Sequence, residues 1–247
     1  MRRSSSPPRT SLVRRLREVT AELGWRRALA VAPRWLVSRR YLVFVSDLRA
    51  PQPDSVPPAE LRVTLLRDPD PGTMPALDAA MAPREAERRL GEGQWCLLGW
   101  WGADLAHCRW ESSRPTYLPY LAQVLRPLPG DLLVASIWTA PRYRGRGVAS
   151  AVMMVGVERA RAAGYSRLVW LTAWWNAPSL RLVPKVTGPR LVGTVGCRGL
   201  GRARRWFVTG DARLDRDGSV VVLAAPPIDP VAFAVGRPRV ESPNQEC

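Results

Sequence analysis

The first forty residues combine the hydrophobic spacing of an amphipathic helix with many arginines. Leu12, Leu16, Val19 and Leu23 recur every three or four positions, and arginines fill many of the positions between them. This spacing predicts a helix over residues 11–32 that ends before a proline. The ten residues before it are rich in Arg, Ser and Pro, which is typical of a disordered tail.

The middle of the chain alternates between strand-like and helix-like patterns. Residues 41–48 (YLVFVSDL) predict a strand, and the proline-rich residues 51–60 predict a linker without regular structure. Residues 61–67 predict another strand, and residues 75–90 predict a helix. Residues 94–112 hold two aromatic-rich runs around a Gly-Ala-Asp triplet, which predicts a β-hairpin.

The second half of the chain is arranged around one long helical pattern. The run DLLVASIWTAP over residues 131–141 predicts a strand stopped by a proline, and the helix after the next turn continues to about Gly164. Residues 166–174 predict a buried strand, and residues 177–188 a short helix or turn. Two closing strands are predicted at residues 189–195 and 202–210.

These elements predict one domain with a mixed sheet, of the α/β or α+β class. The domain covers residues 61–225, because strands and helices alternate there and antiparallel hairpins stand at both ends. Residues 1–50 form a basic N-terminal extension made of a disordered tail, an amphipathic helix and a strand. Residues 226–247 form a proline-rich tail.

The net positive charge of the chain indicates which classes of partner it favours. The formal net charge is +16, and residues 1–40 alone hold eleven arginines against two glutamates. Such a surface attracts phosphate groups, acidic proteins, anionic lipid head groups and nucleic acid. The helix over residues 11–32 therefore has three candidate roles: packing on the domain, lying at an anionic membrane surface, or receiving an acidic carrier protein.

The cysteine and histidine content argues against metal or disulfide chemistry. Four cysteines stand without metal-ligand spacing, which predicts reduced and mostly buried thiols, and we expect no metal. The only histidine, His107, is expected to be packed or hydrogen-bonded within a strand. No apolar run reaches the roughly 18 residues of a membrane span. Arginines interrupt the place where a signal peptide needs an apolar segment, so we expect a cytoplasmic protein, with a peripheral position at the membrane as an alternative.

The turn before the long helix has the composition of an anion site. Gly145 and Gly147 remove the Cβ atoms that would keep a ligand from the backbone, and Arg142, Arg144 and Arg146 add positive charge. The N-terminus of a helix offers unpaired N–H groups and a partial positive charge. The turn therefore suits a pyrophosphate, although an ordinary strand-to-helix turn with solvated arginines would look the same.

Two motifs in order give this turn a context. The spacing Arg142-x-x-Gly145-x-Gly147 resembles motif A of the GNAT superfamily of N-acetyltransferases, (Q/R)-x-x-G-x-(G/A). Ser150 stands where a dinucleotide fingerprint would need a third glycine. The later segment NAPSLRLVPKVTG resembles the second motif of that family. Its matching residues are Asn176, Ser179, Leu182 and Lys185.

The resemblance covers roughly residues 61–206 and implies a mostly antiparallel, twisted sheet flanked by helices. It implies an acyl-CoA thioester lying between the strand at 131–141 and the strand at 166–174, held by backbone N–H groups at its pyrophosphate and pantetheine. One N–H group of the first strand would polarise the thioester carbonyl. The residues implied for acyl-CoA binding are Ile137, Trp138, Thr139, Arg142, Arg144, Gly145, Arg146, Gly147, Val148, Asn176 and Ser179.

The catalytic residues are less clearly marked. Where the family commonly has a tyrosine that protonates the leaving thiolate, this chain has Val183, and Pro184 follows it. A thiol has a pKa of about 8.5, so loss of the acid would slow transfer without forbidding it. Ser179, Tyr117, Tyr120 or water could replace the tyrosine. For the base that takes the proton of an amine, the candidates are Glu111 and Asp131.

The resemblance implies direct transfer of an acyl group, most simply acetyl from acetyl-CoA, to an amine on a small molecule or protein. It implies no metal and no covalent enzyme intermediate. One alternative is an acyltransferase that uses longer acyl-CoA or an acyl carrier protein. Another is a CoA-binding regulatory module without turnover, and a nucleic-acid-binding protein is a third. The proline-broken segment 113–129 is expected to be a loop that covers the acceptor, and several of the tryptophans could line its site.

Overall fold

The computed structural model describes residues 38–50, 57–118, 120–121, 123–186, 188–199 and 205–223. The predicted basic helix over residues 11–32, most of the linker over 51–60 and the tail over 226–247 lie outside these residues.

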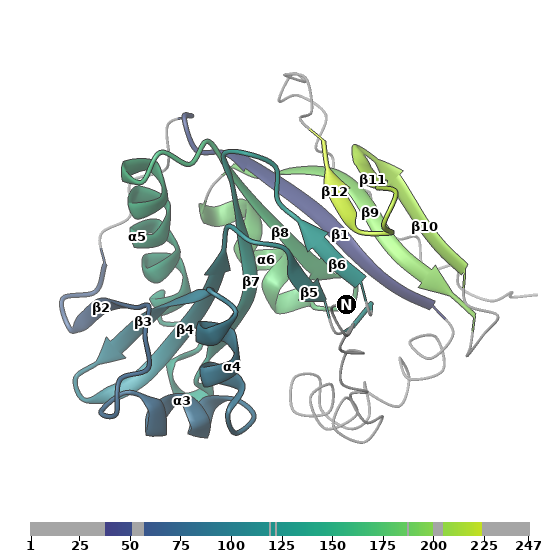
Figure 1. The fold of residues 1–247 in the computed structure, drawn as a ribbon. Helices are drawn as coiled ribbons and strands as arrows, with labels where there is room; N and C mark the ends of the chain where they lie inside the picture. Colours follow the sequence, from purple (N-terminus) through teal and green to yellow (C-terminus); the bar gives the residue numbers. More distant parts are fainter. Residues whose placement is uncertain are drawn as a thin grey trace, which may run out of the picture.

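Eight strands form the main sheet, in the order β10-β9-β1-β8-β7-β4-β3-β2 (Figure 1). Neighbouring strands are antiparallel except β7 and β8, which are parallel. The mixed, mostly antiparallel sheet that the sequence predicted is therefore confirmed. The strands are β1 (Ser38–Asp47), β2 (Leu61–Leu66), β3 (Trp95–Trp101), β4 (Asp104–Ser112), β7 (Asp131–Thr139), β8 (Arg167–Ala173), β9 (Arg190–Arg198) and β10 (Arg205–Gly210).

Strand β1 is inserted in the middle of this sheet, between β8 and β9. Tyr41 pairs with Ala173 on β8 and with Val195 on β9. The strand predicted at residues 41–48 thus exists, but it belongs to the main sheet and not to an N-terminal extension, so the sheet begins well before residue 61. Both faces of β1 are covered, since Val43 and Val45 lie in one hydrophobic cluster and Phe44 in another.

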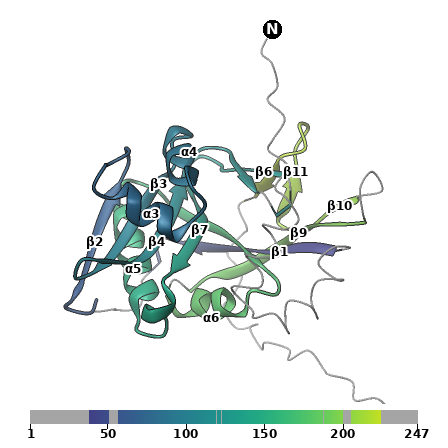
Figure 2. The ribbon, with the colours of Figure 1, turned by 90° about the horizontal axis from the view of Figure 1, so that it is seen from below.

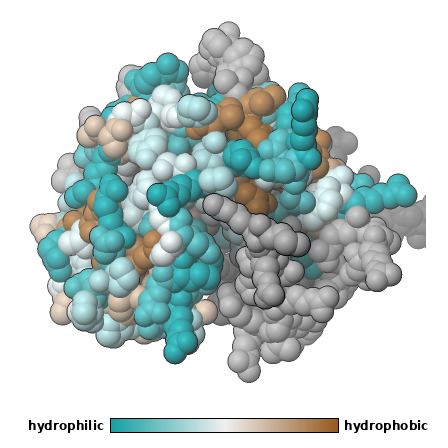
Figure 3. Space-filling model, viewed as in Figure 1, coloured by the Kyte–Doolittle hydropathy of each residue, from teal (hydrophilic) through white to brown (hydrophobic). Residues whose placement is uncertain are grey.

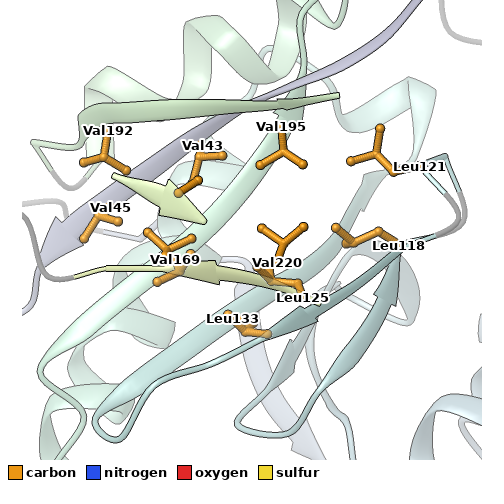
Figure 4. Close-up of a cluster of buried hydrophobic side chains, with 12 residues drawn as sticks. Val43, Val45, Leu118, Leu121, Leu125, Leu133, Val169, Val192, Val195 and Val220 are labelled. Atoms are coloured by element: carbon orange, nitrogen blue, oxygen red, sulfur yellow. The ribbon is translucent and has the colours of Figure 1, made fainter. Parts of the chain in front are cut away.

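A second, small sheet covers one face of the main sheet. Its strand order is β11-β12-β6-β5, and its strands are β5 (Thr116–Leu118), β6 (Gln123–Arg126), β11 (Ala212–Leu214) and β12 (Val220–Val222). Segment 113–129, which we expected to be a loop, supplies two of these strands. Figure 4 shows the apolar cluster between the two sheets, in which Leu118, Leu125 and Val220 face Val43, Val169 and Val195. This apolar contact explains why a segment rich in prolines is held in strands.

Helices cover both faces of the main sheet (Figure 2). Helices α3 (Met74–Ala80) and α4 (Glu85–Gly91) pack on Cys96, Leu98 and Trp110, on the same face as the small sheet. Helices α5 (Val148–Ala162) and α6 (Ala177–Val186) pack on the opposite face. The single helix predicted at residues 75–90 is interrupted, because Pro83 cannot donate a helical hydrogen bond and Arg84 has a φ of 60°.

A buried ion pair lies beneath α5. Arg109 lies 2.7 Å from Glu111 on the same strand and donates to the carbonyl oxygen of Met153 at 3.0 Å. The indole of Trp95 donates to the other oxygen of Glu111 at 2.8 Å. A Cβ placed on Gly156 would lie 2.5 Å from the Arg109 guanidinium. Gly156 therefore leaves the room on α5 that the buried arginine fills.

The surface of the described residues is mixed in character. Figure 3 shows hydrophobic residues gathered over the small sheet and a largely hydrophilic surface elsewhere in that view. In the described part of the chain, no helix has both the length and the apolar character needed to span a membrane. Cys96, Cys108 and Cys197 are buried free thiols, as the cysteine spacing predicted.

We predict that Gly156→Ala lowers the free energy of unfolding by about 1–3 kcal/mol, because the added methyl group overpacks the site of Arg109. Urea denaturation measures this. Gly91→Ala is the matched control, since that helical glycine has nothing within 4 Å of an added Cβ. The control should keep or gain stability, by up to about 1 kcal/mol. Equal behaviour of the two variants would contradict the role given to Gly156.

Candidate functional site

The main sheet opens between β7 and β8. The parallel pairing runs from Asp131 with Arg167 to Val134 with Trp170, where it ends. Beyond that point β7 continues to Thr139 while paired with β4, and β8 continues to Ala173 while paired with β1. The two strands therefore diverge toward their carboxyl ends (Figure 1). Residues 135–139 are only half-buried, as expected for a strand that has lost one neighbour.

Strand alternation decides which backbone groups of β7 face this opening. The N–H of Ala140 donates to the carbonyl oxygen of Ala106 on β4 at 2.9 Å. Because successive residues of a strand turn their backbone groups to opposite sides, Trp138 also faces β4, whereas Ile137 and Thr139 face β8. The family resemblance implied that all three backbones pair with the pantetheine. The register supports this geometry for Ile137 and Thr139, while the Trp138 backbone is used by the sheet.

The turn after β7 presents the N-terminus of α5 at the same edge. Gly145 and Gly147 have φ angles of 77° and 75°, a region that L side chains rarely adopt, and Gly147 is the N-cap of α5. A Cβ on either glycine would meet nothing within 4 Å, so both face open space. No hydrogen bond among the described residues uses the N–H groups of residues 145–148. Unused N–H groups beside open space at a helix N-terminus are suited to binding phosphate oxygens.

The three arginines of the turn have contacts of their own. Arg142 pairs with Asp104 at 2.9 Å, and the Nε of Arg144 donates to the carbonyl oxygen of Thr139 at 3.2 Å. The N–H of Arg144 is also used, by the carbonyl oxygen of Pro141. The guanidinium of Arg146 lies 6.0 Å from the centre of the Tyr143 ring. The free backbone donors thus begin at Gly145, and the Arg144 backbone does not belong to them.

Helix α6 brings the second motif to the same edge. Because β7 and β8 are parallel and each is followed by a helix, the N-termini of α5 and α6 lie at the same edge of the sheet. The side-chain oxygen of Asn176 accepts from the N–H of Ser179 at 3.2 Å, the pattern of an N-cap. Asn176 therefore shapes the start of α6, and Ser179 is half-buried in its first turn. The side chains of residues 183–186 lie outside the described part.

A pocket of about 440 Å³ opens beside the turn, on the face that carries α3. Ala76, Ala79 and Ala80 of α3 line one side of it, and Leu105, Trp138, Pro141 and Arg142 are among the residues on the other. Of the tryptophans near the opening, Trp138 lines this pocket. Trp110 and Trp170 are core residues.

Glu111 and Asp131 do not suit the role of a base. Glu111 is 3% exposed and is held by Arg109 and Trp95. Asp131 is also 3% exposed and receives two hydrogen bonds from Arg167, at 2.6 and 2.8 Å. It begins β7, about 26 Å from Thr139 at the usual rise per residue. Each carboxylate is the acidic partner of a buried structural ion pair. This corrects the expectation that one of them is the base, and the sequence could not show it because a strand-end pattern does not reveal a partner.

His107 is a buried, hydrogen-bonded residue of β4, as expected. Its Nδ1 lies 2.8 Å from the hydroxyl of Thr139. Burial, aided by the charge of Arg109, lowers the pKa of His107 to about 3. The imidazole is therefore neutral at physiological pH and helps to fix the end of β7.

Two tyrosines were named as substitutes for the missing acid. Tyr117 is half-buried on β5. Tyr120 lies near the carboxyl end of β8, where its hydroxyl accepts from the indole of Trp175 at 3.3 Å and its ring lies edge-on to Tyr41. Burial raises the pKa of Tyr120, so the phenol keeps its proton at neutral pH.

The sequence reasoning missed the contacts that Asp104 and Tyr143 make at the turn, and it grouped Trp101 with the other tryptophans near the opening without giving it a partner. Asp104 accepts from both Arg142 and Tyr143, and Trp101 stacks on Tyr143. The only sequence feature that indicated these contacts was the predicted β-hairpin, which places Trp101 and Asp104 at its tip. A hairpin pattern does not predict which other segment its tip contacts.

Comparison with known proteins gives one family match. The family model described as the acetyltransferase (GNAT) family matches residues 124–188, which include the opening, the glycine turn and α6. No curated protein matches the chain.

Several solved structures are similar at low identity. An acetyltransferase of the GNAT family from Novosphingobium aromaticivorans is 20% identical with a TM-score of 0.45, and the match covers 64% of this chain and 62% of that one. A Bacillus subtilis acetyltransferase in complex with CoA is 18% identical with a TM-score of 0.37, over 51% and 74% of the chains. A ribosomal-protein-alanine N-acetyltransferase from Brucella melitensis is 19% identical with a TM-score of 0.37, over 49% and 86%.

We predict that His107 makes the fold sensitive to mild acid. An unfolded histidine has a pKa of about 6.5, so the unfolded chain binds a proton that the folded chain refuses until about pH 3. Stability from this group is therefore lost as the pH falls from about 6.5 toward 3. Between pH 7 and pH 5, the wild type should lose about 2 kcal/mol more than His107→Asn in urea denaturation. If the free energy of unfolding of the wild type and of His107→Asn depends on pH in the same way, His107 is not buried in its neutral form.

Proposed function

We propose that this chain, whose residues 124–188 match the model of the GNAT family of acetyltransferases, transfers an acyl group from acyl-CoA to an amine. The observation that carries the proposal is the junction of two features at one edge of the sheet. One is the opening between β7 and β8, and the other is the glycine turn with its unused N–H groups.

The positions of the free backbone N–H groups suggest where each part of CoA binds. The diphosphate accepts hydrogen bonds from the N–H groups of residues 145–148 at the positive end of α5. The pantetheine enters the opening as a short substitute for a strand, pairing with the backbone groups of Ile137 and the N–H of Thr139, which face β8; the Thr139 carbonyl oxygen already accepts from Arg144. Asn176 shapes the start of α6 on the far side of the opening.

Transfer then needs no covalent enzyme intermediate. The amine nitrogen attacks the thioester carbon, so that a C–N bond forms and the C–S bond breaks. An N–H donor of β7, with Ile137 the best placed, stabilises the charge that develops on the carbonyl oxygen. The thiolate that leaves takes up a proton, which Ser179 or Tyr120 can donate, since both lie where β8 ends.

The acceptor approaches from the face that carries α3. The opposite face is closed by α5 and α6, whereas the pocket between α3 and Trp138 opens beside the turn. Because Glu111 and Asp131 are engaged in buried ion pairs, neither is proposed as the base, and the proton of the attacking amine passes to solvent. Acetyl is the simplest acyl group, and longer acyl-CoA is the alternative that the same phosphate cradle would serve.

We predict that Gly147→Val weakens CoA binding by at least about 100-fold. The added side chain fills the open space where the diphosphate lies and forces a strained φ of 75°. Titration calorimetry with CoA measures the affinity, and release of thiol from acetyl-CoA with a panel of amines measures turnover.

The matched control is Gly164→Val, at the other end of α5. Gly164 has a φ of 84° and likewise nothing within 4 Å of an added Cβ, so this variant carries the same strain of order 1–2 kcal/mol without touching the turn. We expect it to bind CoA like the wild type. Tight CoA binding by Gly147→Val, or an equal loss of CoA affinity in both variants, would contradict the proposed phosphate site.

A further inference from the structure

The tip of the β3–β4 hairpin contacts the glycine turn through one carboxylate. Oδ2 of Asp104 accepts from the Tyr143 hydroxyl at 2.6 Å, and Oδ1 accepts from the Arg142 guanidinium at 2.9 Å. Asp104 and the turn are almost forty residues apart in sequence, so these bonds tie the turn to a separate part of the sheet.

Tyr143 holds the turn from the inside as well. It is 8% exposed, and its ring stacks on Trp101 of the same hairpin tip, with centroids 5.8 Å apart and planes at 28°. The guanidinium groups of Arg142 and Arg146 lie 5.1 and 6.0 Å from the centre of that ring. One aromatic side chain thus positions two of the three cations of the turn.

We propose that Asp104 and Tyr143 are positioning residues for diphosphate binding, acting through the turn without touching the ligand. This inference rests on the proposed function, because it assigns a role within the same phosphate site. Backbone N–H groups cannot change position as long side chains can. The affinity of the turn for the diphosphate therefore depends on how well the turn is held in its binding conformation. The brace made by Trp101, Asp104 and Tyr143 supplies that hold.

Asp104 could also have the opposite effect, since it pairs with Arg142 and carries a negative charge near the diphosphate. The Arg142–Asp104 pair is well exposed, with side-chain exposures of 64% and 48%, and such pairs contribute little. The short hydrogen bond from the nearly buried Tyr143 to a carboxylate is the stronger contact. The positional effect is therefore expected to exceed the gain from releasing Arg142.

The test compares two ligands that differ by the diphosphate. In Asp104→Ala, the Kd of CoA should rise about tenfold, as expected for loss of a charged hydrogen bond. The Kd of pantetheine, which lacks the diphosphate and the nucleotide, should change less than twofold. NMR titrations of the full chain measure both. Tyr143→Phe keeps the ring and its stacking, and it should shift the CoA affinity in the same direction.

The double variant adds a second readout. Because Asp104→Ala and Tyr143→Phe break the same bond, their combined effect on CoA affinity should be well below the product of the two single effects. Asp68→Ala is the charge-matched control. It removes the same charge from an exposed residue. Asp68 follows the carboxyl end of β2, whereas Trp101 of the hairpin tip pairs with Leu61 at the amino end, so this variant should leave both affinities unchanged.

Three results would overturn the proposal. Unchanged or tighter CoA binding by Asp104→Ala would show that the carboxylate only restrains Arg142. Equal loss of CoA and pantetheine would reduce the contact to a role in folding. Failure of the wild type to bind CoA, with the fold intact, would instead reject the proposed function itself.

Discussion

The end of the pairing between β7 and β8 is the constraint on which the rest of the structure depends. After Val134 and Trp170 the ladder stops, although both strands continue and remain paired on their outer sides. Backbone groups inside a sheet need hydrogen-bonding partners, and those of Ile137 have none within the strand ladder on the β8 side. An extended ligand with amide groups can satisfy them, which is the property that the proposed function uses.

The surrounding elements keep this opening from closing. Strand β4 holds β7 over its outer half, and β1 holds β8, because β1 is inserted between β8 and β9. Helix α5 lies across the back of the sheet on the buried pair of Arg109 and Glu111, with Gly156 leaving the necessary room. Losing one partner of a buried ion pair costs about 3–5 kcal/mol, so this support is hard to replace. The α5 N-terminus is thereby fixed at the mouth of the opening.

The local parts of this arrangement were readable from the sequence, and the long-range parts were not. Gly145 and Gly147 predicted the turn because only glycine adopts its φ angles easily, and the hydrophobic patterns predicted most strands. The position of β1 was missed because a strand pattern does not name its neighbours. Asp131 looked like a base at a strand end, yet its partner Arg167 lies on another strand. The brace on Tyr143 was missed for the same reason, since it joins segments that meet only in the folded chain.

The most direct measurement of the central claim is a crystal structure of this chain grown with coenzyme A. The account predicts the diphosphate within hydrogen-bonding distance of the N–H groups of residues 145–148, and the pantetheine between β7 and β8 beside Ile137 and Thr139. An opening filled by other parts of the chain, or coenzyme A bound elsewhere, would contradict it.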